Sequence, residues 1–311
     1  MTATKSAAGM TKLILDTDIG DDIDDALALA LICCLPELEL VGVTTVFGHT
    51  IARARQAQTV LKTAGEKFWK VPVAAGCAGQ LASRPVGSPV SQQDHVPAQA
   101  SASLPDDQLP AIDAKHGVEF LIDTFMAGDG NIVPVTIGAL TNLAVALVKQ
   151  PQIKTKIPRI VSMAAEFHRP MAEWNIKCDP EAAHIVFSSG IPMDVIPFNI
   201  GKLAMFIQAE TSRLAASSKP LANYLTAALQ AWRAGWKQPL AQPSLFDPMA
   251  VACLVKPELF EWKTGTVRVE LAGQQTYGYT TFTPGEGHHR VAWSCVREEA
   301  VGWYLKQILG E

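Results

Sequence analysis

The chain has 311 residues, of which 48% are hydrophobic and 18% are charged, and its formal net charge is −4. This composition is typical of a globular protein with a large core, and the length fits a single α/β domain. The charge balance argues against nucleic acid as a partner, and no apolar run approaches the ~20 residues that cross a membrane.

The first residues and the cysteines indicate where the protein works. Residues 1–11 are small and polar without the apolar stretch of a secretory signal, so we expect a flexible extension there and one domain over residues 12–311. The six cysteines show no CxxC spacing and lie mostly in apolar runs, which is typical of free, buried thiols. Both features predict a cytoplasmic protein.

The first predicted elements enclose a turn that is rich in aspartate. The apolar run at 13–15 is typical of a buried strand, and the alanine- and leucine-rich segment 26–32 is typical of a helix. Six carboxylates follow the strand: Asp16, Asp18, Asp21, Asp22, Asp24 and Asp25. In an open α/β sheet, such a turn lies at the carboxyl end of a strand, where ligands usually bind.

The number of carboxylates in this turn indicates a bound cation. One or two aspartates are explained by helix capping and by the helix dipole, but six are not. Carboxylates this close raise one another's pKa unless a cation offsets their repulsion, and Ca²⁺ takes several such oxygens. The turn is not an EF-hand loop, because counting from Asp16 the sixth residue is Asp21 rather than Gly and the twelfth is Leu27 rather than Glu.

Strands and helices alternate along the rest of the chain, which predicts βαβ units and a mostly parallel sheet. Segment 76–112, which contains His95, has no regular pattern, and a stretch of this kind is usually functional. Strands are predicted at 38–46, 71–75, 132–137, 159–163, 193–196, 265–271, 276–282 and 289–294. Helices are predicted at 51–64, 114–127, 203–215, 220–236 and 297–309, and others begin near 141, 180 and 247.

Three later segments carry polar residues at predicted turns or helix starts. They are Leu140-Thr141-Asn142, Glu173-Trp174-Asn175 and Asp247-Pro248. Taken alone, Thr141 and Asp247 read as helix N-caps. Trp232 and Trp236 lie four residues apart on one predicted helix, where packing in the core is the default and stacking on a base is the alternative.

In this order, the aspartate turn and the three later segments resemble the nucleoside hydrolase family over about residues 12–310. The resemblance implies a single-domain, Rossmann-like α/β fold with a mostly parallel open sheet flanked by helices and a small additional C-terminal β/α part. It implies hydrolysis of the N-glycosidic bond of a nucleoside or related N-riboside, with Ca²⁺ as cofactor. It also implies a homodimer or homotetramer.

The resemblance further implies roles for individual residues. Asp18 would be a calcium ligand and the general base on the metal-bound water, and Asp16 would brace the turn. Asp25, the backbone carbonyl of Thr141, and Asp247 would complete the metal site. The expected substrate contacts are Asp24, His49, Met163, Glu173, Trp174, Asn175 and Phe246. Because Gly20 and Asp24 are further apart than is usual in the family, Asp21 and Asp22 stay an alternative functional pair.

The departures from the family pattern concern the substrate rather than the metal. His49 stands where the family has asparagine, and Phe167 lies near the place of another missing asparagine. Phe246 replaces the histidine that in many members assists the departing base. Protonation of the base is then open between His168, His95 and water, or stacking on a tryptophan replaces it.

Two other functions compete with this interpretation. An apolar strand followed by Asp-x-Asp also resembles haloacid-dehalogenase-type phosphohydrolases, in which Asp16 would be the nucleophile and Asp18 the acid/base. That reading leaves Thr141 and Asp247 unexplained. The missing histidine and asparagines motivate the other alternative, a calcium-stabilised nucleoside or sugar binder without turnover.

Overall fold

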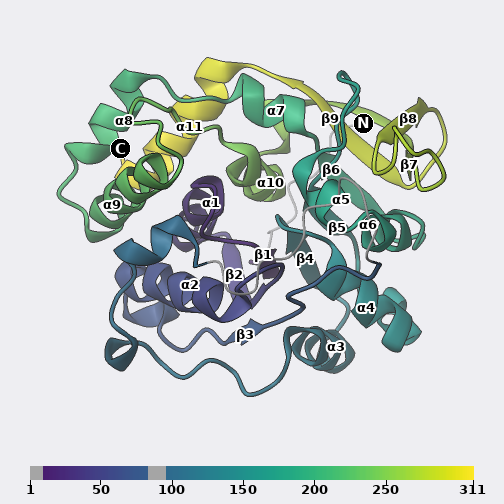
Figure 1. Ribbon diagram of the computed structural model, residues 1–311, viewed down its shortest axis with the longest axis horizontal. Helices are drawn as coiled ribbons and strands as arrows, with labels where there is room; N and C mark the ends of the chain where they lie inside the picture. Colours follow the sequence, from purple (N-terminus) through teal and green to yellow (C-terminus); the bar gives the residue numbers. More distant parts are fainter. Residues whose placement is uncertain (1–9, 83–95) are drawn as a thin grey trace.

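The computed structural model describes residues 10–82 and 96–311, so His95 and most of the predicted N-terminal extension lie outside the described residues. One nine-stranded sheet with the order β3-β2-β1-β4-β5-β6-β9-β7-β8 runs through the molecule (Figure 1). Its strands are β1 (Thr11–Thr17), β2 (Leu38–Thr45), β3 (Val73–Ala75), β4 (Ile132–Thr136), β5 (Ile160–Met163), β6 (Met193–Ile196), β7 (Phe260–Val269), β8 (Thr280–Pro284) and β9 (His289–Cys295).

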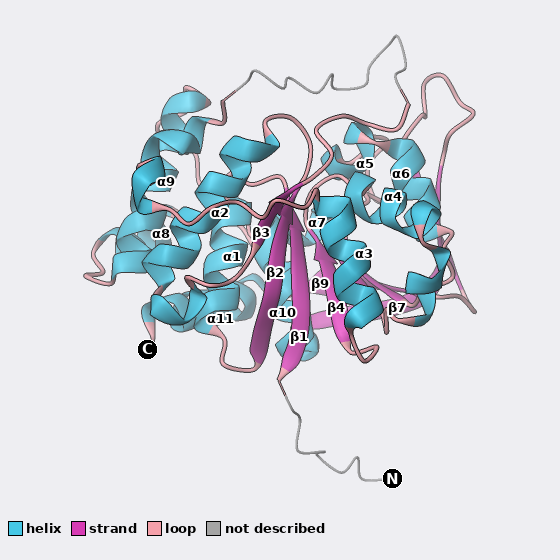
Figure 2. Cartoon of the chain, turned by 90° about the horizontal axis from the view of Figure 1, so that it is seen from below, coloured by secondary structure: helices cyan, strands magenta, loops and turns pink. Residues whose placement is uncertain are grey.

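Helices cover both faces of this sheet, so that the strands lie between two helical layers (Figure 2). One layer contains α1 (Asp24–Cys34), α2 (Thr50–Ala64), α8 (Gln208–Ala215), α9 (Pro220–Gly235), α10 (Phe246–Val255) and α11 (Arg297–Leu309). The other contains α3 (Gly117–Ala127), α4 (Thr141–Lys149) and α6 (Pro180–Phe187), with the short α5 (Trp174–Cys178) beside α6. The short α7 (Phe198–Leu203) follows β6. Within the described ranges, no helix combines the length and the apolar character that crossing a membrane requires.

The apolar run of β1 is buried because it faces both layers. Leu13 and Leu15 pack into the core beneath α1 and α10, whereas Ile14 packs into the core beneath α3 and α4. Alternate side chains of a strand point to opposite faces, so a continuous apolar run suits a central strand. β1 pairs in parallel with β2 on one side and with β4 on the other.

The order of the strands explains why the aspartate turn lies where it does. The chain runs from β1 outward to β2 and β3, and then returns to the other side of β1 as β4. Ligands of open α/β sheets bind at such a reversal, at the carboxyl ends of the strands. The aspartate turn follows β1, and the loop after β4 lies against it, so both belong to this switch point.

The predicted alternation is confirmed, and two segments differ in detail. The helix predicted at 203–215 begins only at Gln208 as α8, because α7 ends at Leu203 and Met205 between them forms an antiparallel bridge with Ser244. The expected C-terminal β/α part extends the main sheet, and its strand predicted at 276–282 begins only at Thr280 as β8. β9 pairs in parallel with β6, and β7 and β8 continue the same sheet with antiparallel pairing.

Candidate active site

A cavity of about 450 Å³ opens at the carboxyl ends of the central strands. Seven carboxyl groups line it, together with one amide and a set of apolar and aromatic side chains. The lining residues are Asp18, Asp21, Asp22, Asp24, Asp25, Ile137, Met163, Glu173, Trp174, Asn175, Phe198, Trp236, Phe246 and Asp247. All of the predicted catalytic and substrate residues except His49 are in this set.

The aspartate turn is fixed at its base by buried hydrogen bonds. The Asp16 carboxylate accepts hydrogen bonds from the Thr44 hydroxyl at 2.7 Å and from the Asn142 amide at 2.8 Å. The Thr17 hydroxyl donates to Asp25 at 2.5 Å, which ties the end of β1 to the start of α1. Asp16 does not line the cavity, so the structure gives it the bracing position that the resemblance implies.

A glycine after β4 determines how close Asp18 lies to the neighbouring strand. A Cβ atom on Gly138 would stand 2.8 Å from both the backbone nitrogen and Oδ1 of Asp18. No side chain fits at this distance, so only glycine allows the two strand ends to approach. The position of Asp18 therefore depends on residue 138 as well as on its own turn.

Three buried carboxylates converge in the cavity. One oxygen each of Asp24, Asp25 and Asp247 lies within 4.8 Å of the others, and all three residues are at most 5% exposed. Asp24 and Asp25 begin α1, and Asp247 lies in the first turn of α10, which packs against α1. The group contains Asp24 and Asp25, whereas Asp21 and Asp22 line the same cavity outside it.

The electrostatics of the cavity show how unfavourable this arrangement is without a cation. Burial, followed by the charges of neighbouring carboxylates, raises the pKa values of Asp24, Asp25 and Asp247 well above their ordinary range. Burial raises the pKa of Asp18 to about 6, although the Arg53 guanidinium opposes the shift. Such a group of oxygen ligands is suited to a hard metal ion.

Arg53 is a positioning residue that the sequence did not reveal. It is 2% exposed, and its guanidinium donates to the backbone carbonyls of Phe47 at 2.7 Å and Ile19 at 3.0 Å and also to that of Asp18. A third nitrogen pairs with Asp21 Oδ2 at 2.8 Å. Arginine provides several donors in a rigid fork, so one side chain holds the outer wall of the turn in place.

Glu173 and Asn175 occupy the wall of the cavity next to β4 and β5. The Glu173 carboxylate caps α5 by accepting from the backbone N–H groups of Asn175 at 2.9 Å and Ile176 at 3.2 Å. The Asn175 amide donates to the carbonyls of Ile137 and Met163, each at 3.0 Å. Burial raises the pKa of Glu173 to about 7.

Four aromatic side chains line the cavity together with the carboxyl groups. Phe246 stacks on Phe198 with 4.9 Å between ring centroids and 24° between planes. Trp174 and Trp236 are 53% and 47% exposed, and both line the cavity. Trp232 is buried at 4% exposure, so of the two tryptophans on α9's last turns, one belongs to the core and the other to the cavity.

Three residues considered for the site lie outside the cavity. His49 instead caps α2, accepting from Ala52 N–H at 3.2 Å, and lines a separate depression with Arg55 and Leu104. The Thr141 hydroxyl donates to Asp179 at 2.7 Å and joins α4 to α6. His168 lies against Trp293 in a further depression.

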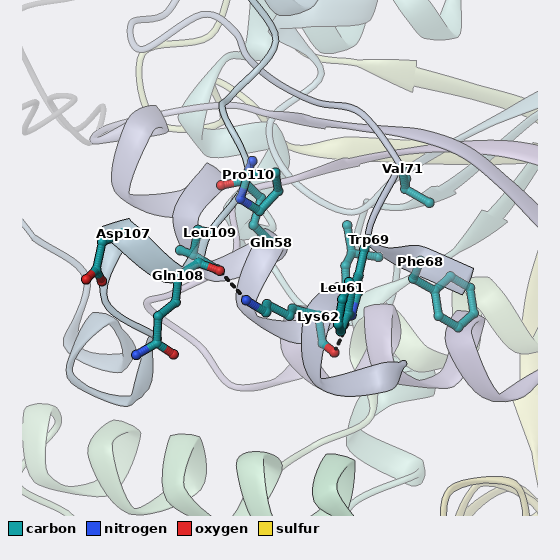
Figure 3. A pocket seen from close by; sticks show the side chains of 10 residues that line it. All are labelled: Gln58, Leu61, Lys62, Phe68, Trp69, Val71, Asp107, Gln108, Leu109 and Pro110. Carbon is teal, nitrogen blue, oxygen red and sulfur yellow. Dashed lines mark hydrogen bonds between the residues drawn. The ribbon is translucent and has the colours of Figure 1, made fainter. Parts of the chain in front are cut away.

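A cavity of about 310 Å³ between α2 and residues 107–110 has a different character (Figure 3). Lys62 points across it toward the backbone carbonyl of Gln108, and the Trp69 indole donates to the Lys62 carbonyl at 3.0 Å. Asp107 is the one carboxylate among its described lining residues. It therefore offers no counterpart to the acidic cluster.

The sequence model of the inosine-uridine preferring nucleoside hydrolase family matches residues 13–301. This chain belongs to that family. Nucleoside hydrolases cleave the N-glycosidic bond of nucleosides, so this chain is a hydrolase acting on N-glycosyl bonds, and the cavity is its candidate active site. Its acidic triad provides a place for a metal ion.

Individual nucleoside hydrolases are similar over nearly the whole chain. A probable uridine nucleosidase from Oryza sativa is 32% identical, covering 94% of this chain and 91% of the relative. The inosine-uridine preferring nucleoside hydrolase of Leishmania major is 32% identical over 86% of each chain. The solved structure of a purine-preferring ribonucleoside hydrolase from Gardnerella vaginalis has a TM-score of 0.79 at 26% identity, covering 96% and 98% of the two chains.

Proposed function

We propose that the chain hydrolyses the N-glycosidic bond of a ribonucleoside or related N-riboside with the help of Ca²⁺, and that Asp18 is the general base. The observation that carries this proposal is the convergence of three buried carboxylates in the cavity that Asp18 also lines. The family resemblance, rather than the three-dimensional arrangement, supplies the choice of Asp18.

The donor set fits a calcium ion. Among the described lining residues, every group able to bind a metal through a charged atom is a carboxylate, and histidine and cysteine are not represented. Oxygen-only sites favour Ca²⁺ or Mg²⁺ over zinc. We assign Asp25 and Asp247 to the ion, with Asp18 and the Thr141 carbonyl as the further ligands that the resemblance implies. A bound cation offsets the repulsion among the carboxylates and lowers the pKa of nearby water.

We assign Asp24 a role of its own, because its neighbours in the structure differ from those that the resemblance implies. The resemblance implies that Asp24 contacts the ribose hydroxyls, whereas in the structure its carboxylate lies beside those of Asp25 and Asp247. We propose that Asp24 accepts hydrogen bonds from the ribose hydroxyls at the border of the metal site. In this arrangement, one carboxylate oxygen of Asp24 faces the metal site and the other faces the ribose.

The chain's own residues account for the chemical step. Asp18 accepts a proton from water as the water oxygen attacks C1′ of the ribose, and the bond to the base breaks. The sugar passes through an oxocarbenium-like state, and the surrounding carboxylates stabilise its developing positive charge. Glu173 and Asn175 hold the ribose end of the substrate, and Met163, Trp174 and Phe246 contact the remainder.

The two alternative functions receive less support. A phosphohydrolase needs Asp16 as an accessible nucleophile, but Asp16 is 2% exposed and does not line the cavity. The chain keeps both Asp18, the proposed base, and all of the implied metal-ligand positions, which argues against a binder without turnover. The relatives named above act on uridine, inosine or purine nucleosides, so they leave the base open. The homodimer or homotetramer stays a prediction.

The variant Asp18→Asn tests the role of the base. It keeps the size of the side chain but cannot accept a proton, and losing a positioned base typically costs about 10²–10⁴-fold. We expect kcat/KM for ribose release to fall at least about 10²-fold. Asp123→Asn, on the exposed face of α3, is the matched control. An Asp18→Asn protein with the activity of the control would rule out this role.

A further inference from the structure

The aromatic side chains among the cavity's described lining residues carry no acidic proton donor for a departing base, and the groups there that can be protonated are the carboxyl groups. Phe246 occupies the place of the histidine that assists the base in many family members, and it stacks on another phenylalanine, Phe198. Among the described residues that line the cavity, there is no histidine, lysine, arginine, tyrosine, serine or threonine. The Asn175 amide is already committed to two backbone carbonyls.

The same cavity is rich in carboxyl groups, and no basic side chain is among its described lining residues. Seven of its lining residues are carboxylic acids, and a divalent cation offsets only two negative charges. Arg53 and Lys202 act on these carboxylates, but neither side chain lines the cavity. A low-dielectric cleft lined by one sign of charge concentrates ligands of the opposite sign.

The tryptophans that line the cavity also favour a positively charged ligand. Trp174 and Trp236 expose about half of their surface, and both line the cavity. A flat cation is attracted to the face of an indole ring, and tryptophan is the best of the aromatic side chains for this contact. An aromatic cation fits both the rings and the field of the carboxylates.

We propose that this active site takes N-ribosides whose base already carries a positive charge, such as pyridinium ribosides and N-alkylated purine ribosides. This inference rests on the proposed function. In the reaction, the bond between C1′ and the base nitrogen breaks, and its electron pair neutralises the charge of the ring. The water oxygen bonds to C1′, and its proton passes to Asp18 and then to solvent. The base leaves neutral without a proton donor.

Matched pairs of substrates test the proposal. The probes are nicotinamide riboside against uridine, and 7-methylguanosine against guanosine, with calcium-loaded protein. Each kcat/KM is divided by the uncatalysed hydrolysis rate of the same substrate, which removes the intrinsic lability of cationic nucleosides. We expect this quotient to be at least about tenfold higher for the cationic member of each pair. We also expect kcat/KM of the cationic members alone to fall several-fold between low and high salt.

The variant Phe246→His tests the missing donor. A histidine at this position supplies the proton that a neutral base needs, a contribution of about 10²-fold or more. We expect the ratio of neutral to cationic kcat/KM to rise by that factor and to decline again at alkaline pH. Phe246→Leu is the control that removes the ring without adding a donor, and it should not raise the ratio.

Several outcomes would overturn the inference. Equal quotients within each pair, or no effect of salt on the cationic members, would do so. A His95→Ala variant that selectively loses turnover of neutral nucleosides would show that His95 supplies the proton. If Asp18→Asn abolishes guanosine hydrolysis and 7-methylguanosine is not preferred, the proposed function stands and this inference falls. Failure to release a base from any of the four probes would overturn both.

Discussion

At the scale of single residues, the close approach of Gly138 to Asp18 fixes where the proposed base lies. A Cβ atom at position 138 would stand 2.8 Å from two atoms of Asp18 and 2.8 Å from Val46 Cγ1. The variant Gly138→Ala must therefore shift Asp18 or its strand. A misplacement of about 1 Å costs roughly 10²-fold in rate.

We expect Gly138→Ala to lower kcat/KM for ribose release by about this factor while the chain still folds. The control is Gly79→Ala, where an added Cβ meets nothing within 4 Å and φ is not in the left-handed region. Steady-state assays and circular dichroism of both variants provide the comparison. Wild-type activity in Gly138→Ala would show that the position of Asp18 is not critical.

The residues that the sequence could predict are those with a local signature. The aspartate turn follows an apolar strand, and Asp247-Pro248 begins a helix, so their patterns can be read without the fold. Arg53 has no such pattern, because its partners are backbone carbonyls on a different element. The sequence did not predict the contacts of His49 either, because a histidine can equally cap a helix or contact a substrate.

At the scale of elements, α2 stabilises the aspartate turn from outside through Arg53. The variant Arg53→Lys keeps the charge, but lysine lacks the fork that reaches several acceptors. Buried carbonyls would lose their donors, and each such loss costs about 1–3 kcal/mol. We expect the free energy of unfolding to fall by about 2–4 kcal/mol, together with loss of calcium affinity.

Arg55 provides the matched control on the same helix. Its guanidinium donates to the Pro110 carbonyl at 2.9 Å, at the surface, and to the half-buried Gln58 side-chain oxygen at 3.2 Å. We expect Arg55→Lys to cost less than about 1 kcal/mol. Urea denaturation of both variants measures the difference. Equal destabilisation would contradict a special role for Arg53.

Most elements follow from periodicity, and the exceptions depend on contacts between distant segments. The alternation of apolar strands and amphipathic helices predicts the parallel part of the sheet. The break between α7 and α8 depends on the bridge between Met205 and Ser244, which no local pattern encodes. The pairing of β9 with β6 likewise joins segments almost 100 residues apart, so its place in the main sheet required the structure.

At the scale of the whole molecule, we expect the acidic site to link stability to pH and to binding of the proposed calcium ion. Without a cation, burial raises the pKa values of Asp18 and Asp22 to about 6 and that of Asp16 to about 7. The unfolded chain loses these protons near pH 4, so the folded state binds more protons between about pH 4 and 7. Stability of the cation-free protein therefore falls as pH rises through this range.

Calcium binds the ionised carboxylates, so its stabilising effect should grow over the same range. We expect the calcium-induced rise in Tm to be larger at pH 8 than at pH 5, and roughly 5 °C at calcium concentrations about 100 times Kd. Differential scanning fluorimetry at both pH values tests this expectation. A shift that is equal or greater at pH 5 would contradict the assignment of these carboxylates to a cation site.

The most direct test of the account is ribose release before and after removal of the metal. The protein is dialysed against chelator, its metal content is checked by mass spectrometry, and neutral and cationic ribosides are assayed with and without added Ca²⁺. We expect ribose release to be lost with the metal and to return when Ca²⁺ is added back. Release at the original rate from metal-free protein would contradict it.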